Sequence, residues 1–516
     1  MQQRYVLVFD VGTQGTRAMV IDSLGNIVVK HKISYTEPYI QGNNGFAEQD
    51  PDFYFKHICT AAKQVQAQAP SIFEKVEAVS LTTIRDTAIC IDQNGKPLRN
   101  AILWLDQRRA TGNATMPLHR QWLLKAIGME ETVNLQYQKS HCNWIREFEP
   151  EIWKNTHKYI LLSTYLIYKF TGKLVDSVAS TVFHGPFDFK RRTWQHKSAL
   201  IYPVFPIEKE KLYPLVESGA VLGVISAQMQ ALSGVPQGLP LIAAGSDKAC
   251  EVIGLGCLAE TSLAAGLGTT ATLTYNSTRY VEPHRFMPAY CSILPNCWNP
   301  EMEVYRGYWL ISWFKKEFAK HEALIAEQQG ISTEQVLDQT LQSIPPGCDG
   351  LLFAPYLTPN INMPNAKGAI VGFSDIHTRL HIYRAIIEGI NFVLLEGMQA
   401  LQKNTGLQFQ EIRIGGGGSN SDEICQITAN MFGLPVVRTT QYEVAGMGAA
   451  ITAFVSLGAF ESFADAIGAM VHIAKTFTPD PKQHAFYQKL LKNVFHNIFP
   501  SLAPLYAQLQ TILKEG

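Results

Sequence analysis

Residues 5–22 constrain the fold of this chain more than any other stretch. A run of strand-forming residues at 6–9 ends in Asp10, a turn rich in glycine and threonine follows, and a second apolar run covers residues 18–21. Two such runs around a turn that contains glycine predict a β-hairpin. Because a further turn precedes the strand-like residues 27–30, the pattern extends to an antiparallel meander.

The turn inside this hairpin has the composition of a phosphate-binding loop. Glycines allow backbone N–H groups to approach a ligand closely, and the neighbouring hydroxyls and Arg17 add donors. Asp10, at the end of the first strand, suits a hydrated Mg²⁺ ion, which prefers a few carboxylates together with phosphate oxygens. The stretch indicates a clamp for a nucleotide phosphate, and an ordinary hairpin with a solvated turn fits this stretch alone equally well.

The length and charge of the chain limit its class. At 516 residues it exceeds one typical hydrophobic core, so two or more large domains are expected. Its 44 basic residues balance 44 acidic ones, and no basic run with interleaved aromatic residues occurs, which argues against a nucleic-acid-binding protein. The nine cysteines form no Cys-x-x-Cys pair, so neither a zinc site nor a disulfide framework is expected.

The cysteines and the chain start predict a cytoplasmic protein. An odd number of scattered cysteines is typical of reduced thiols in a cytosol. The first strand begins so close to Met1 that a signal peptide is not expected. No run of about 20 apolar residues is present that could span a membrane.

A second turn rich in glycine and threonine lies at residues 266–270, between the strand-like residues 262–265 and 271–275. This arrangement echoes the first hairpin and is consistent with a duplicated domain. The turn also fits Gly-x-Gly-x-x-Ala, as do residues 254–259, but a dinucleotide site needs a strand before the glycines and a helix after them. Here a strand follows the first match and a helical pattern precedes the second, so a dinucleotide oxidoreductase is not supported. The P-loop motif is also missing from the sequence.

Four consecutive glycines at 415–418 follow the strand-like residues 412–414 and precede a helical pattern from Ser421. Backbone without side chains at a helix N-terminus offers a flat surface for an adenine ring or a phosphate. A flexible linker is the alternative. The apolar strand before the glycines and the patterned helix after them favour a close approach to a ligand.

Asp247 follows the apolar strand predicted at residues 239–244. A carboxylate in this position can accept the proton of an attacking hydroxyl, which contributes roughly 10²–10⁴ in rate. The same spacing suits an aspartate that caps the following helix, and the two roles are compatible.

Charged and aromatic residues also combine at two predicted strand ends. Arg85 and Asp86 follow the strand at residues 76–82, and Trp104 and Asp106 end a hairpin that starts near residue 88. Aromatic surfaces and charge-assisted hydrogen bonds are typical of sites for sugars and polyols. A surface ion pair and a core tryptophan are the alternative.

These motifs, in this order, resemble the FGGY family of carbohydrate kinases, within the superfamily of actin, hexokinase and the heat-shock chaperones. Asp10-x-Gly12-Thr13 resembles the family's first phosphate motif, Gly268-Thr269 its second, and residues 415–418 its adenosine motif. Three positions depart from the family pattern. His141 stands where a lysine precedes Trp144 by three residues, Gly15 replaces a hydroxyl residue, and Lys248 follows Asp247 where an uncharged residue is usual.

The resemblance implies an α/β fold of two actin-like (ribonuclease H-like) domains, each a mixed sheet flanked by helices, with a cleft between them. It implies an N-terminal domain at residues 1–246 and a C-terminal domain at residues 247–516. The implied activity is ATP-dependent phosphorylation of a hydroxyl of a small sugar or polyol, with a ketopentose such as xylulose favoured and a glycerol-like polyol next. A non-catalytic, nucleotide-binding regulatory protein on the same fold is the alternative, and the retained Asp247 argues against it.

The resemblance also implies a role for each candidate residue. Asp247 would be the general base and contact the sugar, and Asp10 would position Mg²⁺. The sugar pocket would be lined by Arg85, Asp86, Trp104 and Asp106. ATP would contact Gly12, Thr13, Gln14, Thr16, Arg17, Gly268, Thr269, Gly307, Gly416, Gly417 and Asn420. The expected ligands are a small sugar or polyol, ATP or ADP, and Mg²⁺, without nucleic acid or membrane, and homodimers are usual in the family.

Overall fold

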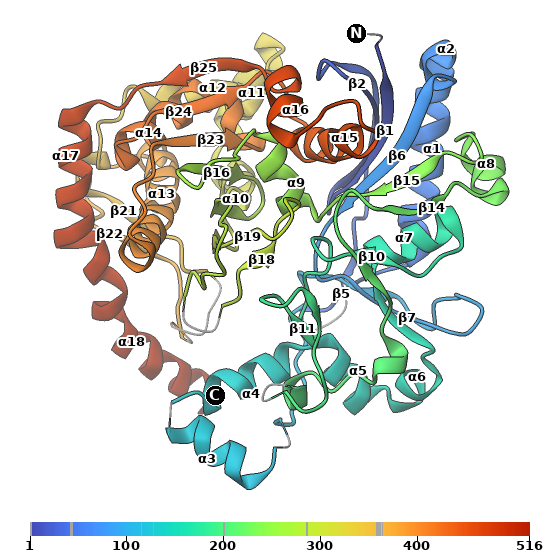
Figure 1. Ribbon diagram of the computed structural model, residues 1–516. Coiled ribbons are helices and arrows are strands. Elements are labelled where there is room, and N and C mark those ends of the chain that lie inside the picture. The colour runs from blue at the N-terminus through green and yellow to red at the C-terminus, as the bar shows by residue number, and fades with distance from the viewer. Residues whose placement is uncertain are drawn as a thin grey trace. The chain divides into compact units, whose positions relative to one another are not determined.

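The computed structural model describes residues 3–41, 45–114, 116–126, 128–199, 202–284, 287–357, 363 and 365–515 (Figure 1). The chain forms two compact units, and each unit combines segments that are distant in sequence. The first unit contains Met1–Gly254, Pro288–Asn299 and Val444–Val471. The second contains Leu255–Met287, Pro300–Glu443 and His472–Gly516.

A six-stranded mixed sheet forms the centre of the first unit. Its order is β14-β15-β6-β1-β2-β3, and the bounds in chain order are β1 (Tyr5–Val11), β2 (Gly15–Asp22), β3 (Ile27–Ser34), β6 (Val76–Thr83), β14 (Val221–Val224) and β15 (Pro240–Ala243). β1, β2 and β3 are successive antiparallel neighbours, so the predicted meander is confirmed. β6 lies parallel to both β1 and β15. The carboxyl ends of these three parallel strands therefore meet at one edge of the sheet.

Helices from distant parts of the sequence cover the two faces of this sheet (Figure 1). α1 (Pro51–Gln68) packs against β2 and β3, and the Asp50 side chain caps its start by accepting a hydrogen bond from the N–H of Asp52. On the other face α15 (Val444–Ser456) packs against β1 and β6, and also against α9 (Asp247–Gly254). A Cβ atom on Gly254 would lie 1.8 Å from the Val444 oxygen, and one on Gly448 would lie 1.9 Å from the Cys250 oxygen. Only glycine allows these two helices to approach so closely.

The second unit repeats the sheet of the first. Its order is β20-β17-β16-β23-β24-β25, and the bounds are β16 (Ser262–Leu267), β17 (Ala271–Thr274), β20 (Glu301–Val304), β23 (Glu411–Gly415), β24 (Val436–Thr439) and β25 (Ile473–Phe477). When the second sheet is read from β25 to β20 and the first from β14 to β3, the parallel and antiparallel pairs follow the same succession. The predicted echo of the first hairpin is thus part of a repeated topology.

Smaller elements complete each unit. In the first unit these are the sheet β4 (Ile40–Gln41), β5 (Ala47–Gln49), β8 (Ala101–Ile102), β7 (Ala88–Ile91) and β9 (Lys158–Leu161), the two-stranded pairs β10 (Asp176–Ser177) with β13 (Leu215–Val216), β11 (Phe187–Asp188) with β12 (Thr193–Trp194) and β18 (Tyr290–Cys291) with β19 (Trp298–Asn299), and the helices α2 (Pro70–Phe73), α3 (Leu118–Ala126), α4 (Glu130–Lys139), α5 (His141–Phe148), α6 (Pro150–Asn155), α7 (Leu162–Thr171), α8 (Ala227–Ser233) and α16 (Phe463–Met470). In the second unit they are β21 (Leu352–Ala354) with β22 (Ala369–Val371), α10 (Trp309–Phe318), α11 (Lys320–Gln329), α12 (Thr333–Leu341), α13 (Arg379–Thr405), α14 (Asp422–Phe432), α17 (Pro481–Leu490) and α18 (His496–Glu515).

The division into units differs from the boundary predicted between residues 246 and 247. Residues 247–254 and 444–471 both belong to the first unit, because α9 and α15 pack against each other and α15 covers the sheet of that unit. Each six-stranded sheet has its own hydrophobic core, with Phe9 and Tyr54 fully buried in the first unit and Phe314 and Phe392 in the second.

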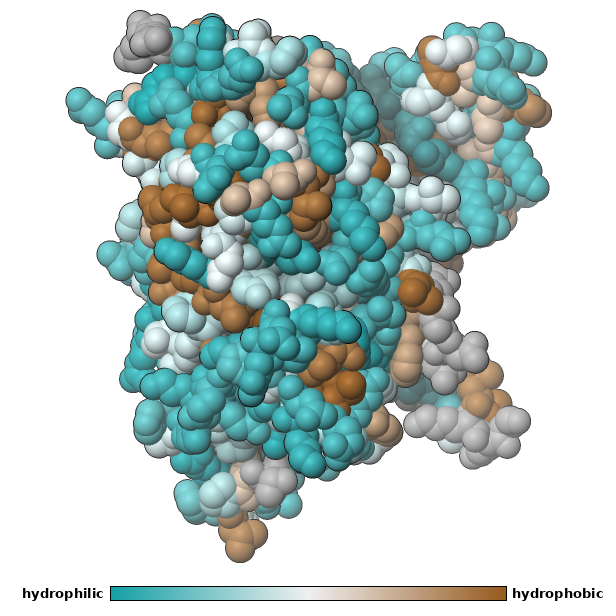
Figure 2. Space-filling model, turned by 90° about the vertical axis from the view of Figure 1, so that its right-hand side faces the viewer, coloured by the Kyte–Doolittle hydropathy of each residue, from teal (hydrophilic) through white to brown (hydrophobic). Residues whose placement is uncertain are grey.

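The surface gives no sign of a large apolar face on the side shown in Figure 2, where hydrophilic residues predominate and apolar residues form small separate groups. Scattered exposed apolar residues are normal for a folded domain. Among the helices that the structure describes, none is long and apolar enough to cross a membrane.

Candidate active site

The candidate residues fall into two groups, one in each unit. The first unit contains the first glycine and threonine turn, the predicted sugar residues and Asp247, and the second unit contains the remaining predicted ATP contacts. Within the first unit, Asp10 and Arg85 lie at or just after the carboxyl ends of β1 and β6, and Asp247 follows β15. Ligands of α/β sheets bind at the carboxyl ends of parallel strands, so this edge is the expected place for a site.

The first turn closes through a hydrogen bond from the Gly12 N–H to the Gly15 oxygen, 3.0 Å long. A Cβ atom at position 15 would lie 2.6 Å from the Ile33 oxygen, so neighbouring β3 leaves no room for a side chain at this position. Thr16 is fully buried, and its hydroxyl forms a hydrogen bond with the Tyr35 hydroxyl, so this group stabilises the first unit. Gln14 is exposed, and Gly12 and Thr13 are partly exposed, which leaves the tip of the turn accessible to a phosphate.

Asp10 is paired with Arg17 across the same hairpin. Nη1 of Arg17 lies 3.1 Å from Oδ2 of Asp10, and the two residues face each other in the β1–β2 register. No cluster of three or more metal-ligating side chains occurs within the described residues. Mg²⁺ commonly uses only one or two carboxylates together with water and substrate phosphates. Asp10 is one buried carboxylate beside a turn that is accessible to a phosphate, so it fits a Mg²⁺ ion that is bound mainly by water and phosphate oxygens.

Trp104 connects the predicted sugar site with this turn. Its indole Nε1 donates a hydrogen bond of 3.0 Å to Oγ1 of Thr13. Trp104 is only partly buried, whereas the alternative interpretation of the sequence was a tryptophan in the hydrophobic core. The bond ties a predicted sugar contact directly to a predicted phosphate contact.

The Asp106 carboxylate is hydrogen-bonded within the first unit. Its side chain is 0% exposed, and Oδ1 accepts hydrogen bonds from the N–H and Nε of Arg108, while Oδ2 accepts them from Nη2 of Arg108 and from the Ala47 N–H. The Arg108 guanidinium also pairs with Glu48 at 2.7 Å and lies over the ring of Phe46. With both oxygens engaged inside the protein, Asp106 holds the loop after Trp104 in place.

Asp86 has a strained backbone conformation and is held by residues 182–184, which are distant from it in sequence. Its φ is +45°, which is uncommon for a residue with a side chain. Its N–H donates to the Val182 oxygen, Nδ1 of His184 lies 2.6 Å from its Oδ2, and the His184 N–H donates to its Oδ1 over 3.3 Å. Although burial alone raises the pKa of Asp86, the charge and hydrogen bond of His184, with the charge of His141, lower it to about 2. Asp86 is therefore an ionised acceptor at neutral pH.

Two other groups belong to this part of the site. His141, the first residue of α5, is buried, and it interacts electrostatically with Asp86, His184, Asp106 and Arg108. Burial lowers its pKa, so the imidazole is neutral at physiological pH. The Arg85 guanidinium lies 5.2 Å from the centre of the Tyr290 ring. The sequence marked His141 only as a departure from a pattern, and His184 and Tyr290 carried no signal, because each is distant in the chain from Asp86 and Arg85.

Asp247 is the first residue of α9, and it does not cap that helix. The N-terminal hydrogen bond comes from Oγ of Ser246, which accepts from the Ala249 N–H over 3.4 Å. Oδ1 of Asp247 accepts from the N–H of Lys248, and within the described residues no hydrogen-bond donor reaches Oδ2. Burial raises the pKa of Asp247, while the charges of Arg85 and Lys248 partly oppose that effect. The Cys250 thiol interacts with both Asp247 and Asp10, which places the two carboxylates near the same helix.

In the second unit, backbone hydrogen bonds hold the second turn, with Gly268 and Thr269, close to Gly307. The Gly268 oxygen accepts from the Tyr308 N–H over 3.1 Å, and the Thr269 oxygen accepts from the Trp309 N–H over 3.4 Å, so the second turn lies against the start of α10. Gly307 precedes this helix, and a Cβ atom there would lie 2.3 Å from the Ala271 nitrogen. β23 leads into a 3₁₀ turn at Gly417–Asn420 and then into α14.

The glycines of this unit separate into two kinds. Gly416 has a φ of +82° and its Cβ would lie 2.8 Å from the Leu267 backbone, and a Cβ on Gly418 would lie 2.4 Å from the Tyr308 ring. In contrast, a Cβ on Gly417 meets nothing within 4 Å, and one on Gly268 meets only the Thr270 oxygen, at 3.7 Å. The fold therefore requires glycine at 416 and 418 but not at 417 and 268. Open space above bare backbone at these two positions fits a nucleotide.

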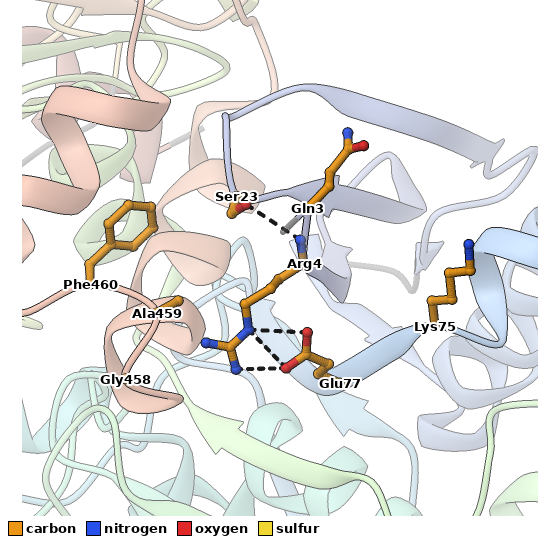
Figure 3. A pocket seen from close by; sticks show the side chains of 8 residues that line it. All are labelled: Gln3, Arg4, Ser23, Lys75, Glu77, Gly458, Ala459 and Phe460. Atoms are coloured by element: carbon orange, nitrogen blue, oxygen red, sulfur yellow. Dashed lines mark hydrogen bonds and ion pairs between the residues drawn. The ribbon is translucent and has the colours of Figure 1, made fainter. Parts of the chain in front are cut away.

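A pocket of about 490 Å³ lies elsewhere in the first unit (Figure 3). It is lined by Gln3, Arg4, Ser23, Lys75, Glu77, Gly458, Ala459 and Phe460. These residues surround the amino ends of β1 and β6, opposite the carboxyl ends that precede Asp247 and Arg85. Figure 3 shows the Arg4 and Glu77 side chains directed at each other, and their ion pair measures 2.6 Å. This pocket is thus separate from the candidate active site.

Comparison with known protein families gives two matches that together cover most of the chain. Residues 5–254 match the N-terminal domain of the FGGY family of carbohydrate kinases, and residues 263–457 match the C-terminal domain of the same family.

Similar proteins cover the chain almost completely. The uncharacterised sugar kinase YgcE of Escherichia coli K12 is 27% identical, with 96% of this chain and 94% of that protein covered. The xylulose kinase of Lactococcus lactis is 24% identical (99% and 100%), and the gluconokinase of Bacillus licheniformis is 26% identical (98% and 97%). Among solved structures, the gluconate kinase of Lactobacillus acidophilus has a TM-score of 0.81 at 23% identity, covering 98% of this chain and 100% of that one. This structural likeness establishes the two-domain fold.

Proposed function

Because the chain belongs to the FGGY family of carbohydrate kinases, we propose that it transfers the terminal phosphoryl group of Mg·ATP to a hydroxyl of a small sugar or polyol. As a carbohydrate kinase of this family, the protein uses ATP as its phosphate donor. A ketopentose such as xylulose is the favoured acceptor and a glycerol-like polyol is the next. Relatives named xylulose kinase support the first choice, and the Arg85–Asp86 pair, which resembles that of glycerol kinases, keeps the second open.

The observation that carries the proposal is the state of Asp247. Its carboxylate lies at the carboxyl edge of the sheet, it interacts electrostatically with Arg85, and among the described residues its Oδ2 has no donor. Asp247 would accept the proton of the attacking hydroxyl as the oxygen–phosphorus bond forms and the bond to ADP breaks. Since phosphoryl transfer needs positioning and charge neutralisation more than covalent catalysis, one carboxylate is a sufficient base.

The other residues of the first unit would position the reactants. Arg85 and Asp86 would bind sugar hydroxyls through charge-assisted hydrogen bonds. Trp104 would present its ring to the sugar while its N–H orients Thr13, and Gly12 and Thr13 would donate to a phosphate. Mg²⁺, when bound near Asp10, would supply positive charge to the phosphate oxygens.

The second unit would hold the rest of the nucleotide. The accessible Thr269 and the bare backbone of Gly268 suit a phosphate, and Gly417 with the exposed Asn420 suits the adenosine.

The test compares ADP release by the purified protein, with xylulose or glycerol as acceptor, in the wild type and in Asp247→Asn. We expect the variant to lose roughly 10²–10⁴-fold in sugar-dependent turnover, because the amide cannot accept the proton, while it binds ATP as before. Asp188→Asn, an aspartate of the same unit outside the site, serves as the control. Normal turnover by Asp247→Asn would contradict the assignment of the base.

A further inference from the structure

The backbone just before Asp247 is bonded to a segment that is distant from it in sequence. The Ala244 oxygen accepts a hydrogen bond of 2.7 Å from the Ser177 hydroxyl, and these two residues are 67 positions apart. The N–H of Ser246, the residue next to Asp247, donates to the Ala179 oxygen over 3.0 Å. The turn between β15 and α9 is therefore held at both of its ends by the same short segment, which begins with β10.

The middle of this turn is tightly packed. A Cβ atom on Gly245 would lie 3.0 Å from the side chains of Ala249 and Ile293. It would also lie 3.2 Å from the Ala179 side chain, so the distant segment packs against the turn as well as bonding to it. The Gly245 oxygen accepts from the Thr82 hydroxyl over 3.1 Å. Because the turn is buried, hydrogen-bonded and closely packed, any displacement of it would move the start of α9 as well.

Asp176 holds the serine that donates to the turn. Its side chain is buried, its Oδ1 accepts from the Ser177 N–H over 2.7 Å, and its Oδ2 accepts from the hydroxyls of Ser163 and Thr164 over 2.5 and 2.7 Å. The Ser177 hydroxyl accepts from the Ser180 N–H over 3.1 Å. Of the two possible acceptors for that hydroxyl, the oxygen of the turn is nearer, at 2.7 Å, than the Ser180 hydroxyl, at 3.2 Å. Since a hydroxyl has one proton, Ser177 donates it to the turn.

This network costs free energy to bury, and the turn before Asp247 is what it holds. A carboxylate in a protein interior is tolerated only when it is hydrogen-bonded, and apolar side chains of similar volume often stabilise a fold equally well. A fully bonded polar network instead specifies one arrangement of the groups that it joins. The same segment continues to Val182 and His184, which hold Asp86. One segment thus connects the backbone of the candidate base with a predicted sugar contact.

We propose that Asp176 and Ser177 are positioning residues for phosphoryl transfer, and that they hold the turn before Asp247 so that its carboxylate faces the acceptor hydroxyl. This inference rests on the proposed function, because it requires Asp247 to be the base. A base must lie within hydrogen-bond reach of the proton that it accepts, and a misplacement of about 1 Å can reduce the rate about 100-fold. Loss of the Ser177 bond should therefore lower kcat. The proposed ATP contacts do not include this turn, so the KM for ATP should stay the same.

Ser177→Ala removes the bond to the turn, and Ser233→Ala is a closely matched control. Both serines are buried in the first unit. The Ser233 hydroxyl likewise donates to a carbonyl, that of Met229, over 2.7 Å and accepts from an N–H, that of Val235, over 3.2 Å. We expect Ser177→Ala to lower kcat about tenfold or more with an unchanged KM for ATP, whereas Ser233→Ala keeps the wild-type kcat. The melting temperatures of the two variants should fall by similar amounts, which separates positioning from stability.

A double-mutant cycle with the base tests whether Ser177 acts through it. In the Asp247→Asn background no ionised base remains to be positioned, so adding Ser177→Ala should change the residual kcat less than about twofold. A full, additive loss in that background would overturn the inference. The assays are run at about pH 8, because burial raises the pKa of Asp176 to about 6 and its carboxylate is then ionised.

Ser218→Ala provides a second variant should Ser177→Ala not fold. The Ser218 hydroxyl donates to the same Ala244 oxygen over 3.0 Å, and this serine is only partly buried, shortly after β13, the parallel neighbour of β10. We expect Ser218→Ala to lower kcat about threefold or more at an unchanged melting temperature.

The failure of this inference can be told from the failure of the proposed function. An unchanged kcat in Ser177→Ala, or in Ser218→Ala where the first variant does not fold, would overturn the inference, as would an equal loss of kcat in Ser233→Ala. In each of these cases Asp247→Asn would still lose its turnover, and the proposed function would stand. Normal turnover by Asp247→Asn would overturn the assignment of the base, and the inference with it.

Discussion

The indole nitrogen of Trp104 lies 3.0 Å from the hydroxyl oxygen of Thr13, to which it donates a hydrogen bond. The two residues are 91 positions apart in sequence, one after a short strand of the five-stranded sheet and the other in the turn between β1 and β2. The bond joins the residue expected to face the sugar with the residue expected to face a phosphate.

Trp104→Phe should therefore reduce catalysis more than it reduces stability. The ring remains, but Thr13 loses the donor that orients its hydroxyl, and a lost neutral hydrogen bond corresponds to roughly three- to tenfold in kcat/KM. Steady-state kinetics with ATP and sugar varied separately would measure this. Trp194→Phe is the matched control, because the Trp194 indole donates over 2.7 Å to the Tyr213 oxygen, outside the site. Equal losses in both variants would show that the Trp104 bond has no special place in the reaction.

The pH profile of the reaction should show the pKa of Asp247, which burial raises. A general base acts only when ionised, and burial raises the pKa of this carboxyl above the ordinary 3.8. The acidic limb of kcat/KM should accordingly fall at a higher pH than an exposed aspartate would give. Because the charge of Lys248 lowers this pKa, Lys248→Met should move the limb further upward. A limb that moves downward in this variant would contradict the role given to Asp247.

Gly416 and Gly417 should respond differently to alanine. Gly417→Ala places a methyl group in open space, so the melting temperature should stay the same while the KM for ATP rises about tenfold, if adenosine lies on this backbone. Gly416→Ala forces a Cβ to 2.8 Å from the Leu267 backbone at a φ of +82°, so this variant should lose stability by about 1–3 kcal/mol. Thermal unfolding and ATP kinetics on both variants provide the measurement. An unchanged KM in Gly417→Ala would remove this glycine from the nucleotide site.

A buried ion pair should matter to stability in the second unit. Glu388 accepts hydrogen bonds from Nε of Arg384 over 2.7 Å and from the Tyr487 hydroxyl over 2.7 Å, and all three side chains are buried. Glu388→Gln should destabilise this unit by about 3–5 kcal/mol, because the Arg384 charge is left buried without its counter-charge. Glu317→Gln breaks an exposed pair with Lys316 and should cost less than about 1 kcal/mol. Denaturant unfolding followed by tryptophan fluorescence would compare the two, and similar losses would refute the expectation.

Much of the local structure could be read from the sequence. The β1–β2 hairpin, the strand before the four glycines and the second glycine and threonine turn were all predicted, and the structure confirms each of them. These features depend on hydrophobic period, turn residues and capping groups within about 20 neighbouring positions, and such signals are local. β9 was not predicted, because a four-residue apolar strand cannot be told from a buried helical turn by its pattern.

The sequence by itself determined the strand–turn units, their repetition and the family of the chain, since each of these follows from residues close together or from the order of motifs. Only the tertiary structure decided which partner each polar side chain has. It paired Asp86 with His184, 98 residues away, engaged Asp106 with Arg108 inside the protein, and placed α15 on the sheet of the first unit. The physical reason is that burial and hydrogen bonding depend on which distant segments the chain brings together, and one sequence contains no local signal for that choice.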